Sequence, residues 1–313
     1  MGTRERRTWR ALAAAASILV LGLAGCSTAP EPAQQDGADE RPVVLTTFTV
    51  LADIAENVAG DHLRVESLTK LGAEIHGYEP TPDDLRRAAD ADLIIDNGLN
   101  LEAWFAQFTA DSSAPHVTVS GDVDVIDIAE EEGAGKPNPH AWMSPLNVQK
   151  YVARMADAFS ELDPAHAQDY RSNARTYQQQ LQAVHDELTA KLEKIPAAQR
   201  VLVSCEGAFS YLARDVGLKE KYLWAVNAES QATPRKVASA IDYVREHQVP
   251  AVFCESTVSD AAMQRVVEST DAHYGGTLYV DSLSAPDGPV PTYLDLITKD
   301  TELIANALTG DPR

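Results

Sequence analysis

Short apolar runs alternate with helical patterns along this chain, and this alternation constrains its fold more than any other feature. Apolar runs at Val43–Leu45, Val65–Leu68 and Leu93–Asp96 predict strands, and helical spacing follows the first of them over Thr49–Ala59. Alternating strands and helices are typical of parallel sheets with helices on both faces. We therefore expect an α/β lobe in the first half of the chain.

The second half has the same alternation. Runs at Val201–Val203, Ala251–Phe253 and Leu278–Val280 predict strands, and helices are expected over Phe209–Asp215 and Val237–Glu246. A second α/β lobe, with its own parallel-type sheet and flanking helices, should therefore follow the first.

Three helix starts share one local signal. In each, a Ser or Thr that can cap the helix precedes a Pro at the first helical position, as in Thr81-Pro82, Ser144-Pro145 and Thr233-Pro234. We expect a helix to begin at each of these sites.

A long stretch between the two halves contains neither Pro nor Gly. Ala165–Ile195 is rich in Gln, Ala, Leu, Glu and Lys, which predicts one helix of about 45 Å at about 1.5 Å per residue. Because a single helix bends less than crossing strands, we expect little hinge motion. The predicted domains are an N-terminal lobe at 42–164, a linking helix at 165–196 and a C-terminal lobe at 197–313.

The N-terminus has the features of an export signal. Several Arg residues between Arg4 and Arg10 precede an apolar run at Ala11–Gly25, which is too short to span a bilayer well. The run ends in Leu-Ala-Gly before Cys26, which resembles the cleavage box of bacterial lipoproteins. We expect a signal peptide at 1–25, a lipid on Cys26 and a location on the extracytoplasmic face of the cell membrane.

The next segment, 26–41, is rich in Pro, Ala, Gln and acidic residues, which is typical of a flexible tether. The whole chain has 47 acidic and 26 basic residues, a formal charge of −21. This balance argues against nucleic-acid binding, which needs a basic surface. It is compatible with a protein that meets cations, and equally with a merely well-solvated surface.

Four potential metal ligands lie in loops beside predicted elements. His76 and His140 come shortly before helix starts, and Glu206 and Asp281 follow predicted strands. In open α/β sheets, ligands bind at the carboxyl ends of the strands. Each half supplies two of the four residues, so they could meet in the cleft between the lobes. Taken singly, each could also be a cap or a solvated charge.

The segments around these residues resemble a known family. HGYEPTPDDL, NPHAWMSP, EGAFSYLARDVGL and LYVDSLSAPDGPVPTYLDLI are similar, in this order, to the cluster A-I solute-binding proteins of ATP-driven manganese and zinc importers. The resemblance covers the chain from about Val43. It implies two α/β lobes joined by one long helix, and it makes His76, His140, Glu206 and Asp281 the metal ligands. The implied partners are a membrane permease and its ATPase, and we expect a monomer.

The donor set bears on which metal is bound. Two imidazoles and two carboxylates suit manganese better than all-nitrogen or thiolate sites do. A Glu at the third ligand position resembles the manganese and iron members of the family. Zinc members more often have His there and a His-rich acidic loop, whereas 122–136 contains acids and no His. We expect Mn(II), with zinc and iron as alternatives.

Metal-bound His commonly donates its other ring N–H to a neighbouring oxygen. Residues that could support the ligands in this or similar ways are Tyr78, Asn138, Trp142 and Ser256. The remaining histidines match no motif and are expected to lie outside the site: His62, His116, His166, His185, His247 and His273.

Cys205 and Cys254 both lie at the carboxyl ends of predicted strands. Neighbouring parallel strands would place them at one level, and an exported protein meets an oxidising environment. We expect a disulfide, with two free buried cysteines as the alternative. Cys205 directly precedes Glu206, so we further expect the disulfide to hold that ligand in place and its reduction to weaken metal binding.

Four protein ligands leave little room for the water that a catalytic zinc site keeps. The chain shows no HExxH motif, no Ser-His-Asp spacing and no glycine-rich phosphate loop. We therefore expect a binding protein rather than an enzyme. A metalloenzyme and an adhesin or structural lipoprotein are the distant alternatives.

Overall fold

The computed structural model describes residues 39–105, 114–129, 133–226 and 232–310. The predicted signal peptide, Cys26 and the tether up to residue 38 lie outside these residues. From Arg41 onward the chain forms one unit with its own core. Among the described residues, no helix combines the length and apolar character needed to cross a bilayer.

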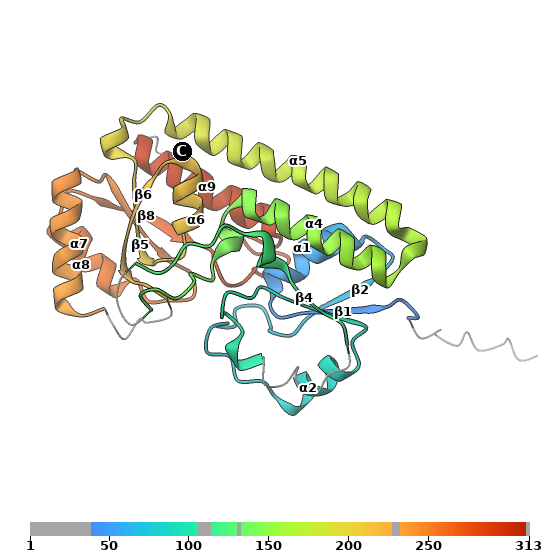
Figure 1. Cartoon of the computed structure of the whole chain (residues 1–313). Coiled ribbons are helices and arrows are strands. Elements are labelled where there is room, and N and C mark those ends of the chain that lie inside the picture. Colours follow the sequence, from blue (N-terminus) through green and yellow to red (C-terminus); the bar gives the residue numbers. More distant parts are fainter. Residues whose placement is uncertain (1–38, 106–113, 130–132, 227–231, 311–313) are drawn as a thin grey trace, which may run out of the picture. The chain divides into compact units, whose positions relative to one another are not determined.

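The first lobe contains a parallel sheet of four strands in the order β2-β1-β3-β4 (Figure 1). These strands are β1 (Val43–Thr46), β2 (Arg64–Ser67), β3 (Leu93–Asp96) and β4 (His116–Thr118). Two helices connect them, α1 (Thr49–Ala59) between β1 and β2 and α2 (Pro82–Ala89) before β3. The strands predicted from apolar runs are confirmed, whereas β4 was not predicted.

The second lobe is built from two parallel strand pairs, β5 with β6 and β7 with β8. They are β5 (Val201–Glu206), β6 (Lys219–Trp224), β7 (Ala251–Glu255) and β8 (His273–Leu278). The two pairs meet edge to edge, since the Cα atoms of Cys205 on β5 and Cys254 on β7 are 4.8 Å apart. This lobe also contains α6 (Ser210–Val216), α7 (Pro234–His247), α8 (Ala261–Ser269) and α9 (Tyr293–Thr309).

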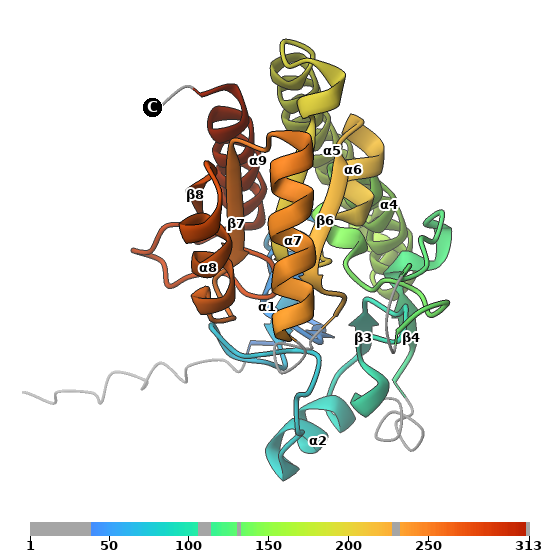
Figure 2. The ribbon, with the colours of Figure 1, turned by 90° about the vertical axis from the view of Figure 1, so that its left-hand side faces the viewer.

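Helices cover both faces of these strands, as the alternation predicted. Figure 2 views the lobe from the side of α7 and α8, with α9 behind the strands. Val201 and Val203 pack with Val237 of α7 and Met263 of α8, whereas Leu202 belongs to the core on the opposite face. Successive strand residues point to opposite faces, so one strand contributes to both layers.

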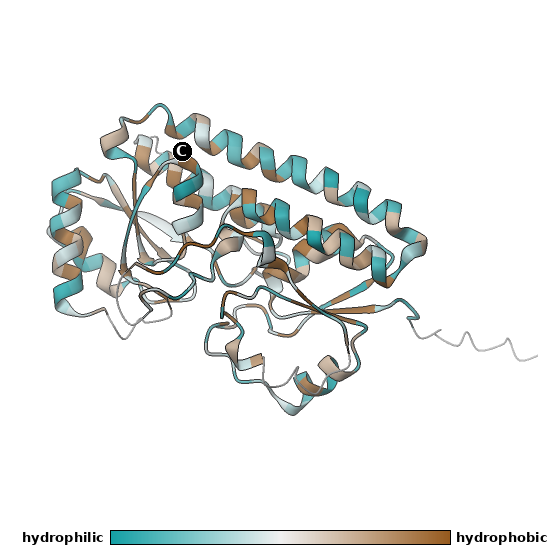
Figure 3. Ribbon diagram, viewed as in Figure 1, coloured by the Kyte–Doolittle hydropathy of each residue, from teal (hydrophilic) through white to brown (hydrophobic). Residues whose placement is uncertain are grey.

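The long helix α5 (Ala167–Leu192) runs beside α4 (Pro145–Leu162), α1 and α9 (Figure 1). It is shorter than the predicted Ala165–Ile195 at both ends: a 3₁₀ turn at Pro164–His166 precedes it, and it ends at Leu192. Its outer side is hydrophilic (Figure 3), and its buried residues form a stripe with spacings of three, four or seven. That stripe consists of Tyr170, Ala174, Tyr177, Leu181, Leu188 and Leu192.

One buried cluster extends through both lobes. It joins Val44 of β1 and Trp142 with Phe253 of β7 and Leu278 of β8, together with the apolar stripe of α5. A shared core resists separation of the lobes, because opening it would expose apolar surface to water. This supports the expectation of little hinge motion, and the lobe boundaries at 42–164 and 197–313 stay predictions.

The helix starts were predicted correctly from local sequence signals. Thr81 accepts a hydrogen bond from the Asp84 N–H, and the Asp84 carboxylate accepts one from the Thr81 N–H. Ser144 and Thr233 likewise cap α4 and α7. All three predicted helix starts are confirmed, because each cap involves residues only three positions apart.

The last strand was predicted wrongly. Leu278–Val280 was expected, but β8 is His273–Leu278, so Asp281 lies in the loop beyond it. Most of β8 is polar or glycine and carries no apolar run. Its glycines are needed by packing, since a Cβ at Gly275 would lie 2.4 Å from Phe253 Cε1. Predictions of Glu206 as a loop residue were also wrong, because it ends β5.

Candidate metal site

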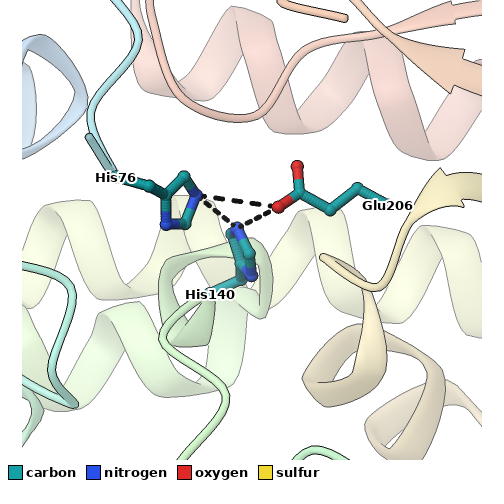
Figure 4. Close-up of side chains that lie close together, drawn as sticks. All are labelled: His76, His140 and Glu206. Atoms are coloured by element: carbon teal, nitrogen blue, oxygen red, sulfur yellow. Dashed lines mark hydrogen bonds and ion pairs between the residues drawn. The ribbon is translucent and has the colours of Figure 1, made fainter. Parts of the chain in front are cut away.

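The four predicted ligands come from four separate segments of the chain. His76 lies in the loop between β2 and α2, and His140 directly precedes a 3₁₀ turn at Ala141–Met143. Glu206 is the last residue of β5, and Asp281 follows β8. Figure 4 shows the side chains of His76, His140 and Glu206 pointing toward one another.

His76, His140 and Glu206 form one cluster, and Asp281 lies within 4.0 Å of both imidazoles. The Nε2 atoms of His76 and His140 are 3.1 Å apart, and each lies 3.7 Å from Glu206 Oε1. Asp281 Oδ1 is 3.8 Å from His76 Nε2 and 4.0 Å from His140 Nε2. Two atoms bonded to one ion at about 2.1 Å are about 3.0 to 3.4 Å apart, so small side-chain movements would bring all four onto one ion.

The cluster is closed off from solvent. The exposed fractions of the side chains are 7% for His76, 0% for His140, 2% for Glu206 and 3% for Asp281. Buried carboxylates of this kind are unfavourable unless a charge or donors compensate them. A divalent cation would supply that charge.

The hydrogen bonding of Asp281 is the feature that most specifically indicates a cation site. Its Oδ2 accepts a hydrogen bond of 3.3 Å from Thr257 Oγ1. Its Oδ1 is buried and has no hydrogen-bond partner among the described residues, although it faces both imidazoles. Since a buried acceptor without a donor is costly, this oxygen fits a site that holds a cation.

Burial also controls the protonation of the cluster. Desolvation, and then the neighbouring His76 imidazole, hold the pKa of His140 well below its ordinary value. His140 is therefore neutral at physiological pH, which is the form that binds metals. Desolvation raises the pKa of Asp281, the His76 imidazole lowers it, and the Glu74 carboxylate raises it.

The loop that carries His76 is held from two sides. The Glu74 carboxylate accepts hydrogen bonds from the N–H groups of His76 (2.7 Å) and Gly77 (2.8 Å). The Trp104 indole N–H donates to the Ile75 carbonyl at 3.0 Å. Neither Glu74 nor Trp104 was predicted, although Glu74 lies only two residues before His76.

Of the predicted supporting residues, Asn138 and Trp142 contact the site. Asn138 Oδ1 accepts from the His140 N–H at 3.0 Å and lies 3.0 Å from His140 Nδ1. The Trp142 indole donates to the Val280 carbonyl, next to Asp281, at 3.0 Å. In contrast, Tyr78 donates its hydroxyl to Asp84.

Ser256 makes its hydrogen bond through the main chain, since its N–H donates to the Leu278 carbonyl. The histidines predicted to lie outside the site pair elsewhere where partners are seen, for example His62 with Asp169 and His116 with Asp96. None of them joins the metal cluster found among the described residues.

Glu255 supports the site and was missed. It ends β7 as Glu206 ends β5, and its Oε2 accepts the Glu206 N–H at 3.1 Å. Burial raises the pKa of Glu255 to about 8. A signal was present in the sequence, because the dipeptide Cys205-Glu206 recurs as Cys254-Glu255.

The predicted disulfide is present and joins Cys205 to Cys254. It ties β5 to β7 one residue before Glu206 and Glu255. The two strand ends that carry these acids are therefore linked covalently as well as by a hydrogen bond.

Comparisons with known proteins show metal-binding relatives with this fold. The family described as zinc-uptake complex component A, periplasmic, matches residues 44–307. The iron-binding protein YfeA of Yersinia pestis is 46% identical over 304 residues, covering 96% of this chain and 98% of YfeA. The manganese-binding lipoprotein MntA of Halalkalibacterium halodurans is 32% identical, covering 93% and 96%.

Solved structures of metal-binding proteins have a similar fold. The Mn-bound periplasmic metal-binding protein from Candidatus Liberibacter asiaticus superposes with a TM-score of 0.80 at 38% identity, covering 86% of this chain and 100% of that one. The periplasmic zinc-binding protein TroA of Treponema pallidum gives 0.78 at 26%, covering 86% and 99%. The chain therefore belongs to the zinc-uptake complex component A family, the cluster A-I metal-binding receptors of ABC transporters, which are not enzymes.

Proposed function

We propose that this protein is a lipid-anchored extracytoplasmic receptor that binds Mn(II) at His76, His140, Glu206 and Asp281. It delivers the ion to an ABC permease, whose ATPase drives import. The observation that carries this proposal is that the two imidazoles lie close to both carboxylates, while Oδ1 of Asp281 has no hydrogen-bond partner among the described residues.

The donor set and the relatives support manganese. Two carboxylates match the charge of a divalent cation, and mixed nitrogen and oxygen donors suit Mn(II). The relatives include a manganese-binding lipoprotein and a Mn-bound structure.

Iron is the second candidate. It is favoured by the 46% identity to the iron-binding protein of Yersinia pestis, which exceeds the identity to the manganese-binding relative. Fe(II) and Mn(II) accept similar donors, so the same four residues serve either ion. Zinc follows from the family's description, and it should bind in vitro because Zn(II) stands above Mn(II) in the Irving–Williams order.

The anchor and the partners rest on different support. Curated relatives are described as lipoproteins and as substrate-binding components of metal ABC transporters. In this chain Cys26 would carry the lipid, and the segment 26–41 would tether the folded unit to the membrane. All four ligands come from one chain, so a monomer suffices for binding.

Calorimetric titration of metal-stripped protein without the signal peptide tests this proposal. Mn(II), Fe(II) under anaerobic conditions and Zn(II) are titrated separately, with Asp281→Asn as the matched variant. Sub-micromolar one-to-one Mn(II) binding that Asp281→Asn loses supports a manganese receptor.

Other outcomes of the titrations would change the metal assigned to the site or overturn the proposal. Fe(II) bound more tightly than Mn(II) would make the protein an iron receptor. Zn(II) binding without Mn(II) or Fe(II) binding would make it a zinc receptor. Absence of binding for all three ions would overturn the four-ligand site.

A further inference from the structure

We propose that Asn138, oriented by the Gly207 carbonyl and the His140 N–H and supported by Ser210 and Glu220, is a positioning residue that fixes His140 in one tautomer and joins it to the segment carrying Glu206. This inference rests on the proposed function, because it concerns how two of the proposed ligands are prepared for the ion. It assigns roles to Ser210 and Glu220, which lie outside the ligand cluster.

Every polar atom of the Asn138 side chain is in use. Oδ1 accepts from the His140 N–H and faces His140 Nδ1, both at 3.0 Å. Nδ2 donates to the Gly207 carbonyl at 2.7 Å and to Ser210 Oγ at 3.3 Å. With 3% of the residue exposed, water does not compete for these bonds.

The partners on the Gly207 side determine which way the amide points. A carbonyl oxygen can only accept, so Gly207 requires the NH₂ group. Ser210 donates its hydroxyl to Glu220 Oε2 at 2.5 Å, which leaves its oxygen to accept from Asn138. Both contacts place Nδ2 on this side and therefore Oδ1 toward His140.

The orientation of the amide in turn determines the proton on His140. Because Oδ1 can only accept, His140 Nδ1 must carry the hydrogen. His140 Nε2 then keeps a free lone pair, and this atom faces His76 Nε2 at 3.1 Å and Glu206 Oε1 at 3.7 Å. That is the tautomer that metal binding through Nε2 requires.

Asn138 is itself anchored without help from His140. Its N–H donates to the Ile126 carbonyl at 2.8 Å, and its carbonyl accepts from the Tyr211 hydroxyl at 2.7 Å. The Glu220 carboxylate also accepts the Phe209 N–H at 3.0 Å. The hydrogen bonds that lead from Glu220 through Ser210 and Asn138 to His140 are therefore anchored at main-chain groups, at Phe209 and at Asn138.

The same side chain couples two ligands from different lobes. Gly207 directly follows Glu206, and its N–H donates to the carbonyls of Trp224 (3.0 Å) and Ala225 (3.1 Å). A displacement of the Gly207 carbonyl would therefore also displace His140, because the side-chain amide of Asn138 is hydrogen-bonded to both residues. A merely structural clamp would hold the lobes without selecting a tautomer, and this difference can be measured.

Nuclear magnetic resonance of the ¹⁵N-labelled metal-free protein at pH 8 reports the tautomer directly. Signals of His140 are assigned by their loss in His140→Ala. We expect one tautomer, protonated on Nδ1, in the unsubstituted protein. Asn138→Leu should give a mixture, because no acceptor then faces His140 Nδ1. Ser210→Ala should keep the proton on Nδ1, because the Gly207 carbonyl and the His140 N–H still orient the amide.

Mn(II) titration supplies the second readout. Asn138→Leu should weaken binding about 10- to 100-fold, the usual cost of losing a residue that orients a ligand. Ser210→Ala should weaken it about 2- to 10-fold, the value of one neutral hydrogen bond. The matched control is Ser160→Ala, since Ser160 donates its hydroxyl only within α4, to the Ala156 carbonyl. It should change neither the tautomer nor the affinity.

Cooperative thermal unfolding establishes that each variant is folded. A proton on Nε2 in the unsubstituted protein, or one unchanged tautomer in Asn138→Leu, would overturn the inference. If the tautomer shifts as expected but the unsubstituted protein binds no metal, the positioning role stands and the proposed function fails. If the unsubstituted protein and all variants bind Mn(II) equally, the proposed function stands and the positioning role fails.

Discussion

At the scale of single residues, the site places groups where they are unfavourable in the absence of a cation. Asp281 is buried with one oxygen that has no hydrogen-bond partner among the described residues, and Glu206 is buried at the carboxyl end of β5. Binding and stability therefore oppose each other at these positions, because a group that is suited to an ion destabilises the ion-free fold.

Asp281→Asn separates the two effects. The neutral amide removes the negative charge of one proposed ligand. Mn(II) affinity should therefore fall more than 10-fold, as expected when a charged residue that binds the metal directly is lost. The free energy of unfolding of the metal-free variant should be equal to or greater than that of the unsubstituted protein. Chemical denaturation with chelator, together with calorimetry, measures both.

The exposed Asp287 provides the control for Asp281→Asn, since Asp287→Asn should change neither quantity. Retained Mn(II) affinity in Asp281→Asn would remove Asp281 from the set of ligands. A large loss of metal-free stability would show instead that its carboxylate is structurally required.

At the scale of elements, the ends of β5 and β7 form one assembly. The disulfide joins Cys205 to Cys254, and Glu255 accepts the N–H of Glu206. A cross-link between residues 49 positions apart stabilises mainly by restricting the unfolded chain. If it also holds the carboxylate of Glu206, it should affect affinity as well as stability.

The double variant Cys205→Ser with Cys254→Ser tests this coupling. Its free energy of unfolding should be lower by about 4 kcal/mol, from the lost cross-link. Its Mn(II) affinity should also fall, because the end of β5 is then held only by hydrogen bonds. Reduction of the unsubstituted protein should reproduce both changes. A loss of stability with unchanged affinity would refute the coupling and leave the disulfide a purely structural role.

At the scale of the whole molecule, the protein buries acids outside the ligand set. Burial raises the pKa of Glu102 to about 7, of Glu220 to about 7 and of Glu255 to about 8. Glu102 accepts hydrogen bonds from Thr47 and from the N–H groups of Asn97 and Gly98, which oppose that shift without cancelling it. The folded protein therefore binds protons that the unfolded chain has already released.

The stability of the metal-free protein should accordingly fall as pH rises. Since the folded pKa values exceed the unfolded ones, the stabilisation is complete below about pH 4.5 and is lost through pH 7 to 8. Between pH 6.5 and 8.5 the loss should be about 3 kcal/mol. His140, whose pKa is lowered, acts in the opposite direction only below this window.

Guanidinium unfolding at several pH values in chelator measures this slope. Glu102→Gln, which cannot lose a proton, should show a shallower dependence than the unsubstituted protein. Stability that rises between pH 6.5 and 8.5 would contradict the assignment. Metal affinity should move the other way and increase with pH, because protons compete with the ion for the ligands.

Local sequence determined a large part of this protein. The caps at Thr81, Ser144 and Thr233 and the long helix between the lobes depend on residues within a few positions of one another, and the structure confirms them. The apolar runs likewise predicted the α/β class. The candidate ligands came from motifs around His76, His140, Glu206 and Asp281, each readable within about ten residues.

Contacts between residues that lie far apart in the sequence were decided by the tertiary structure alone. In β8, Phe253 occupies the space that a side chain at Gly275 would need, and Leu303 occupies that of Gly276; no local signal in the sequence indicates either contact. Glu255 reaches Glu206 across 49 residues, and Ser210 reaches Asn138 across 72. Periodicity and capping act over one or two turns of chain, whereas a site is made by packing. The sequence therefore identified which residues could bind a metal, and the fold decided their distances, their protonation and the residues that hold them.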